Sequence, residues 1–205
     1  MDIAHQEALA RLLSEGDRAY HNLDLDAAVD SYQHAADLEP ASYEAQLGLA
    51  RTYGRMRARP QALAACEQCI ALNPDRYEAY AAKATLLFLS DDLDEAEASA
   101  RAALERADQE PEPWLTLAQI AGDRAHFEEA DHYLAEARER IASVPPGQER
   151  DELTAMAWHA ETYLRLMAND PSAARETAQK VIEMEEASPY AAALLRHLSA
   201  STGSE

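Results

Sequence analysis

The two cysteines, Cys66 and Cys69, have a spacing that could serve metal binding or redox chemistry. A structural zinc site needs four ligands, commonly two such pairs, and the chain has no second pair. A redox pair of this spacing belongs near a junction between a strand and a helix, which this stretch does not resemble. Free cysteine behaves as a small buried apolar residue, so we interpret both as core residues.

A second candidate for metal binding is the pair His126 and His132, with Glu128 and Asp131 between them. A separation of six residues places the two imidazoles on different sides of a helix, so we predict no metal site. The sequence also lacks a glycine-rich phosphate loop, a serine nucleophile elbow and a zinc-protease motif. We therefore predict that the protein is not an enzyme and carries no cofactor.

Four arginines, Arg51, Arg55, Arg57 and Arg59, form the densest basic cluster of the chain. The guanidinium group can hold a carboxylate through two parallel hydrogen bonds. One hypothesis is that Arg51 and Arg55 receive an acidic group of a bound peptide. The alternative is that they form ordinary surface ion pairs with residues such as Asp17 and Glu44, and bind nothing.

Composition limits the class of partner. The 205 residues include 38 acidic and 18 basic ones, which gives a net charge of −20. This charge disfavours nucleic acid and anionic membranes as ligands, because both are bound through Lys and Arg. It favours basic partners, or it simply keeps the surface solvated. The N-terminus does not resemble a signal peptide, and no segment reaches the ~18 apolar residues of a membrane span. We expect a cytoplasmic protein, either complete or a domain of a longer one.

A repeat of 34 residues organises the chain. Tyr43-Glu44-Ala45 returns as Tyr77-Glu78-Ala79, and two series of small residues keep the same spacing. These series are Ala28, Ala62, Ala96 and Ala130, and Ala35, Cys69, Ala103 and Ala137. A period of this length is typical of helical repeat arrays, and no alternating strand pattern is present. The sequence therefore predicts an all-α solenoid.

Helix and turn signals divide this array into five helix pairs and a last helix. Val144–Gly147 is the clearest linker. Beyond it, the next unit matches the preceding one only after an offset of 44 residues in place of 34. We therefore expect a longer helix to begin near Gln148 and another to begin at Pro171. Gly16 should let a neighbouring helix come close. The expected repeats within a single solenoid, 1–205, are 8–41, 42–75, 76–109, 110–145 and 148–187, followed by a capping helix at 188–200 and a tail at 201–205.

The repeat resembles the tetratricopeptide repeat (TPR) family, whose pattern pairs Leu-Gly and an aromatic in the first helix with alanines in the second. The matches in the first two units are Leu12, Gly16, Ala28, Tyr32, Ala35, Pro40, Leu49, Ala50, Tyr53, Ala62, Cys66, Cys69 and Pro74. In the fourth unit they are Trp114, Leu117, Ala118, Ala130, Leu134 and Ala137. The third and fifth units match less well, with Lys83, Glu161 and Thr162 at Leu-Gly positions.

This resemblance implies a right-handed superhelix whose concave groove is lined by the first helix of each pair and binds peptides or helices of other proteins. Members that bind chaperone tails carry Lys, Asn and Arg as a carboxylate clamp. The corresponding positions here hold Leu13, Asp17, Gly48, Glu78 and Ala82. We therefore expect no binding of acidic chaperone tails.

The register of the repeat predicts which side chains face the groove. They are Asp17, Tyr20, Arg51, Arg55, Thr85, Phe88, Gln119, His159 and Tyr163, together with Leu13, Leu47, Ala81, Leu115 and Leu166. The predicted function is a non-enzymatic interaction module that holds a peptide or partner segment in this groove, as a monomer or weak homo-oligomer. The alternatives are a self-associating scaffold and a TPR domain of a larger regulatory protein. Met156, Tyr163, Leu166 and Met167 make the C-terminal part of the groove more apolar, which suits both peptide binding and self-association.

Overall fold

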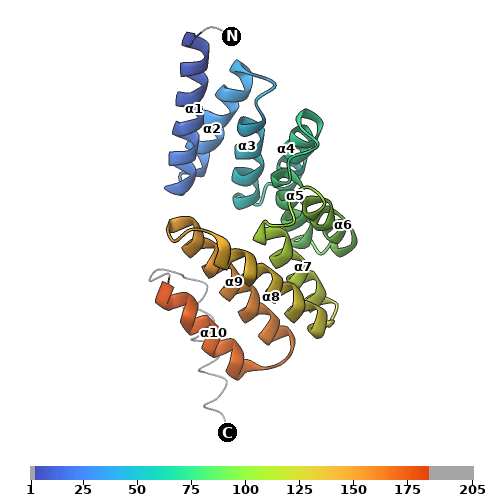
Figure 1. Ribbon diagram of the computed structural model, residues 1–205. Helices are drawn as coiled ribbons and strands as arrows, with labels where there is room; N and C mark the ends of the chain where they lie inside the picture. The colour runs from blue at the N-terminus through green and yellow to red at the C-terminus, as the bar shows by residue number, and fades with distance from the viewer. Residues whose placement is uncertain (1–2, 185–205) are drawn as a thin grey trace. The chain divides into compact units, whose positions relative to one another are not determined.

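The computed structural model describes residues 3–184, and within this range the chain forms ten α-helices and no strand (Figure 1). Their bounds are α1 Ile3–His21, α2 Leu25–Leu38, α3 Tyr43–Arg55, α4 Arg59–Leu72, α5 Glu78–Phe88, α6 Leu93–Leu104, α7 Pro111–Asp123, α8 Phe127–Ser143, α9 Gln148–Met167 and α10 Pro171–Met184. The longer helix from Gln148 and the helix start at Pro171 confirm the shifted register. The predicted capping helix at 188–200 and the tail at 201–205 lie outside the described residues.

The helices pack in sequential pairs and form two compact units, Met1–Arg106 and Ala107–Glu205. The first unit contains the pairs α1/α2, α3/α4 and α5/α6, and the first helices of neighbouring pairs, α1 with α3 and α3 with α5, also touch. The second unit contains α7/α8 and α9/α10, with α9 packed against both α7 and α8. Each unit therefore has a layer of first helices and a layer of second helices. None of the ten described helices has the length and apolarity needed to cross a bilayer.

One turn geometry recurs between the two helices of every pair. A residue with left-handed φ, between 57° and 62°, sits in each turn, at Leu23, Arg57, Asp91, Ala125 and Asn169. In the first turn, the N–H of Leu23 donates to the carbonyl of Tyr20 and the N–H of Asp24 to that of Ala19. The other four turns repeat these two bonds. This is the Schellman arrangement that ends a helix and satisfies its last carbonyls.

Small residues set the distance between the paired helices. Alanines at equivalent positions of the five second helices, Ala28, Ala62, Ala96, Ala130 and Ala174, are each no more than 1% exposed. The ring of Tyr32 lies between two glycines. A Cβ atom added to Gly16 would lie 2.6 Å from this ring, and one added to Gly48 would lie 2.4 Å from it. The predicted close approach at Gly16 is confirmed, and Gly48 provides a second one.

Arginines from the ends of two second helices connect neighbouring repeats in the same way. Arg106 Nε donates to the carbonyl of Pro74 at 2.6 Å, and its guanidinium lies over the Tyr80 ring, 3.9 Å from the centroid. Arg140 Nε donates to the carbonyl of Asp108 at 2.6 Å and covers the Trp114 ring at 4.5 Å. Each contact lies within one unit. The arginine therefore covers an aromatic side chain and satisfies a carbonyl of the loop between repeats.

Candidate functional site: the first-helix face and an arginine hollow

Six of the nine predicted groove residues come from neighbouring first helices of unit Met1–Arg106. Spacings of three or four residues put the two members contributed by each helix on the same side of it. We call this surface the first-helix face, and it consists of Asp17 and Tyr20 from α1, Arg51 and Arg55 from α3, and Thr85 and Phe88 from α5.

The α1 side of the first-helix face is tied to the core. The Tyr32 hydroxyl donates to Asp17 Oδ1 at 2.7 Å. Burial, followed by this hydrogen bond, raises the pKa of Tyr32, so the phenol stays protonated and keeps donating. The guanidinium of Arg55 lies over the Tyr20 ring, with Cζ 4.2 Å from the centroid. Tyr20 thus holds Arg55 through a cation–π contact that leaves its N–H groups available.

The two arginines on α3 carry the positive charge of the first-helix face. Arg51 and Arg55 are both exposed, and among residues 3–184 neither forms an ion pair. Asp17 is instead bound to Tyr32, and Glu44 is bound to Arg76, whose Nη1 lies 2.6 Å from its Oε1. The two acidic neighbours considered as partners from sequence are therefore occupied elsewhere.

The α5 residues and the three residues of the second unit predicted to face the groove differ in exposure. Thr85 is exposed, and its hydroxyl donates to the carbonyl of Ala81 at 3.2 Å, while Phe88 is half-buried. In unit Ala107–Glu205, Gln119, His159 and Tyr163 are half-buried on α7 and α9. The Tyr163 hydroxyl donates to the Asp123 carboxylate, which links α9 to α7.

The expectation that Leu47 and Leu115 line the groove is wrong. They are only 8% and 4% exposed. Leu47 belongs to the cluster that packs Tyr43 against Cys69 of α4 and Ala79 of α5. Leu47 and Leu115 lie one helical turn before Arg51 and Gln119 and share their side of the helix, but packing buries both leucines.

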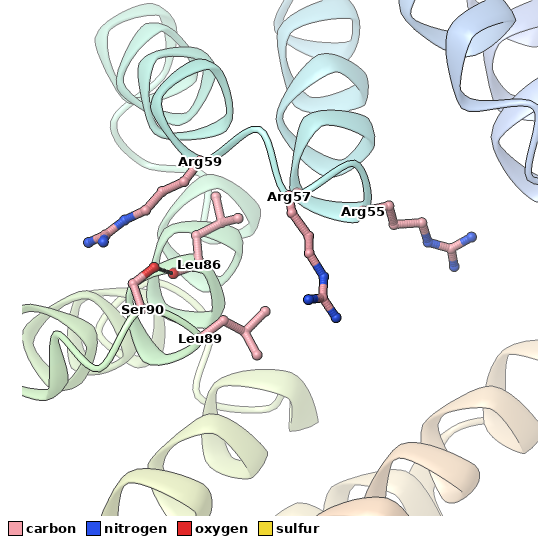
Figure 2. Close-up of a pocket in the computed structure, with 7 residues that line it drawn as sticks. Arg55, Arg57, Arg59, Leu86, Leu89 and Ser90 are labelled. Atoms are coloured by element: carbon pink, nitrogen blue, oxygen red, sulfur yellow. Dashed lines mark hydrogen bonds between the residues drawn. The ribbon is translucent and has the colours of Figure 1, made fainter. Parts of the chain in front are cut away.

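Sequence reasoning missed a hollow at the end of α3. It has a volume of about 350 Å³. Figure 2 shows the side chains around it, which come from the α3–α4 turn and from the C-terminal end of α5. We call it the arginine hollow, and it is lined by Arg55, Arg57, Arg59, Leu86, Leu89 and Ser90. The four-arginine cluster was the sequence signal for it, but the leucines come from the next repeat and only folding brings them there.

The cysteines are core residues, as predicted. Cys66 and Cys69 are both 0% exposed, and both thiols are free. Burial raises the pKa of each to about 12, which keeps them protonated and unreactive. Within the described part of the chain, no group of three or more His, Cys, Asp or Glu side chains is arranged to hold a metal ion.

The stacked helix pairs, the recurring turn and the alanine-lined contacts define a helical repeat protein. The fold is that of tetratricopeptide repeat proteins. No protein-family model matches the sequence, and no curated protein matches it either.

Three solved structures show the likeness in fold. A TPR protein of Thermus thermophilus, TTC0263, is 16% identical over 93% of this chain and 98% of its own, with a TM-score of 0.76. A chain of the Cut9–Hcn1 hetero-tetramer of the APC/C is 12% identical over 93% of this chain, with a TM-score of 0.69. The match covers only 42% of that longer chain. YrrB, described as a TPR protein with an unusual peptide-binding site, gives 15% identity and a TM-score of 0.54 over 96% of this chain and 97% of its own.

Proposed function

We propose that the protein is a non-enzymatic, cytoplasmic interaction module, and that its first-helix face binds an acidic segment of a partner protein. The observation that carries the proposal is the pair Arg51 and Arg55. On a chain with a net charge of −20, these two guanidiniums form no ion pair with any described residue. The peptide-binding site named for YrrB gives the fold a precedent for holding a peptide.

The chemistry of the first-helix face suits an extended acidic ligand. Arg51 and Arg55 lie one helical turn apart, so two carboxylates of one segment can each meet a guanidinium. Tyr20 holds Arg55 through the cation–π contact, and the rest of its ring can contact an aliphatic side chain of the ligand. The half-buried Phe88 adds apolar surface from α5. None of these groups provides an activated nucleophile or a metal centre, which is why we propose binding rather than catalysis.

The test is selection of a phage-displayed library of random 12-residue peptides on the purified full chain, with affinities measured by fluorescence polarisation. We expect enriched peptides rich in Asp and Glu. Replacing Arg51 and Arg55 together by Ala should weaken their binding roughly tenfold or more, because each arginine makes a charge-assisted hydrogen bond. The control replaces Arg11 and Arg101, two exposed arginines, one on another side of α1 and one on α6. Equal affinity of wild type and the Arg51/Arg55 variant would refute the proposal.

Self-association is the second candidate, because α9 exposes two methionines. Met156 is 45% exposed and Met167 is 44% exposed. Flexible methionine side chains suit an interface that must adapt to its partner. Light scattering over a range of concentrations tests this candidate. A mass that rises with concentration in the wild type, and stays monomeric in Met156→Lys, would support it.

A further inference from the structure

We propose a second docking site, the arginine hollow, for a partner segment that carries a large apolar side chain next to a carboxylate. This surface differs from the first-helix face because it is built from the end of α3, the start of α4 and the end of α5. It therefore belongs to the edge of the helix layers, where the turns lie, rather than to the face of the first helices.

The hollow offers an apolar wall. Leu86 is half-buried, whereas Leu89, the residue that follows α5, is 71% exposed. Gly54 keeps this wall open on the α3 side, since a Cβ atom there would lie 3.1 Å from a Leu86 methyl. A volume of about 350 Å³ accommodates one large side chain rather than a protein domain.

Of the three arginines around the hollow, only Arg57 is both without an ion pair to any described residue and directed towards the side of the leucines. Arg59 lies 3.7 Å from a carboxylate oxygen of Asp92. Arg55 is stacked on Tyr20 and, as Figure 2 shows, points away from the leucines. Arg57 leaves the α3–α4 turn on the side of Leu89, and within residues 3–184 it forms neither an ion pair nor a ring contact.

The backbone at Arg57 allows its guanidinium to be removed without disturbing the turn. Its φ is 59°, a left-handed conformation that glycine adopts more readily than any side-chain-bearing residue. The equivalent residue in the turn of each of the other helix pairs shares this conformation, so it is a property of the turn, and glycine is compatible with it.

Exposed apolar side chains extend this edge. Met56 is 40% exposed and follows α3, while Leu23 is 68% exposed in the α1–α2 turn. The contact between Arg55 and Tyr20 shows that the ends of α1 and α3 adjoin, and the hollow shows that α3 adjoins the end of α5. The edge therefore presents apolar side chains beside an uncommitted cation. On a chain with a net charge of −20, it is a place that an acidic segment can approach.

The experiment uses the same phage-displayed peptide library on the full chain, with Arg57→Gly and Leu89→Ser as test variants. Arg57→Gly removes the cation and suits the left-handed turn, so it should fold at least as well as wild type. Ala125→Gly is its matched control, because it places glycine at the equivalent turn position, φ 59°, without a change of charge. Thermal unfolding of all variants verifies folding.

We expect a class of enriched peptides that pair Asp or Glu with a large apolar residue. Their affinity should fall roughly tenfold or more in Arg57→Gly and clearly in Leu89→Ser, and should be unchanged in Ala125→Gly and Arg51→Ala. Peptides that respond to Arg51→Ala but not to Arg57→Gly would overturn this proposal and leave the first-helix face standing. Enriched peptides without a carboxylate, or no enrichment at all, would overturn it as well.

Discussion

At the scale of single residues, Tyr32 shows how small neighbours position a large side chain. Its ring is packed between Gly16 of α1 and Gly48 of α3, and its hydroxyl reaches Asp17 on the first-helix face. The same ring atoms, Cδ1, Cε1 and Cζ, lie closest to both glycines. This contact therefore fixes the spacing of two first helices and the position of a site residue together.

Gly48→Ala should destabilise the protein, because the added methyl would lie 2.4 Å from the trapped ring. Overpacking of this kind costs about 1–3 kcal/mol, more than the helix propensity that alanine gains. The measurement is the free energy of unfolding in urea. Gly54→Ala is the control, since its Cβ meets only a flexible Leu86 methyl at 3.1 Å. If Gly48→Ala were as stable as Gly54→Ala, the packing account of Tyr32 would be wrong.

The two buried thiols make a prediction about pH. Burial raises the pKa of Cys66 and Cys69 to about 12, above the value of about 8.5 for an exposed thiol. When a group has a higher pKa in the folded state than in the unfolded state, its contribution to the free energy of unfolding is fully present below the unfolded-state pKa. That contribution is lost as the pH rises towards the folded-state pKa. Urea midpoints should therefore fall above about pH 8.5, and fall less steeply when both cysteines are replaced by Ala. Native protein should also react slowly with Ellman's reagent at neutral pH, and rapidly once unfolded.

At the scale of elements, the contacts between repeats depend on a few recurring side chains. Arg106 and Arg140 stand one period apart, and each covers an aromatic residue and donates to a carbonyl of the preceding loop. Arg140 is only 13% exposed. The planar fork of arginine makes the stacking and the carbonyl bond at once, which lysine cannot do.

Arg140→Lys should therefore lower the free energy of unfolding by about 1–2 kcal/mol, the worth of a charge-assisted hydrogen bond and a cation–π contact. Because Arg140 covers Trp114 and the Trp114 indole N–H donates to the Asp108 carbonyl at 3.0 Å, the tryptophan fluorescence should also shift to the red. Arg101→Lys, on the exposed side of α6 where it pairs with Glu97, should change neither quantity. An unchanged midpoint for Arg140→Lys would show that this contact does not hold the repeats.

At the scale of the whole molecule, the chain divides between the third and fourth helix pairs. The first unit, Met1–Arg106, contains three complete pairs, all the residues of the first-helix face and the arginine hollow. Three repeats bury a continuous core, which is about the minimum for a stable array. Both proposed docking surfaces therefore belong to one part that has its own core.

We predict that a fragment of residues 1–106 folds by itself. Its circular dichroism per residue should be as helical as that of the full chain, and its unfolding in urea should be cooperative. It should be less stable than the full chain, since a shorter array has fewer stabilising interfaces between repeats. A fragment with the spectrum of an unfolded chain would contradict the independence of this unit.

Much of the fold followed from periodicity alone. The helix pairs could be predicted from the spacing of Ala28, Ala62 and Ala96, because small residues recur wherever the same two helices must touch. Gly16 was identified for the same reason. The start of α9 could be predicted from the shift of register after Gly147. The recurring left-handed turn was not foreseen, since glycine, the usual signal, is absent from all five positions.

The sequence by itself determined which residues occupy first helices, and therefore most members of the first-helix face. Only the tertiary structure decided which of them are open to a ligand. Leu47 and Leu115 share a side of their helices with Arg51 and Gln119, yet both are buried, because contacts with neighbouring elements and not the period alone decide exposure. The arginine hollow arises for a related reason: Arg57 and Leu89 belong to different repeats, and their proximity depends on how one pair stacks on the next.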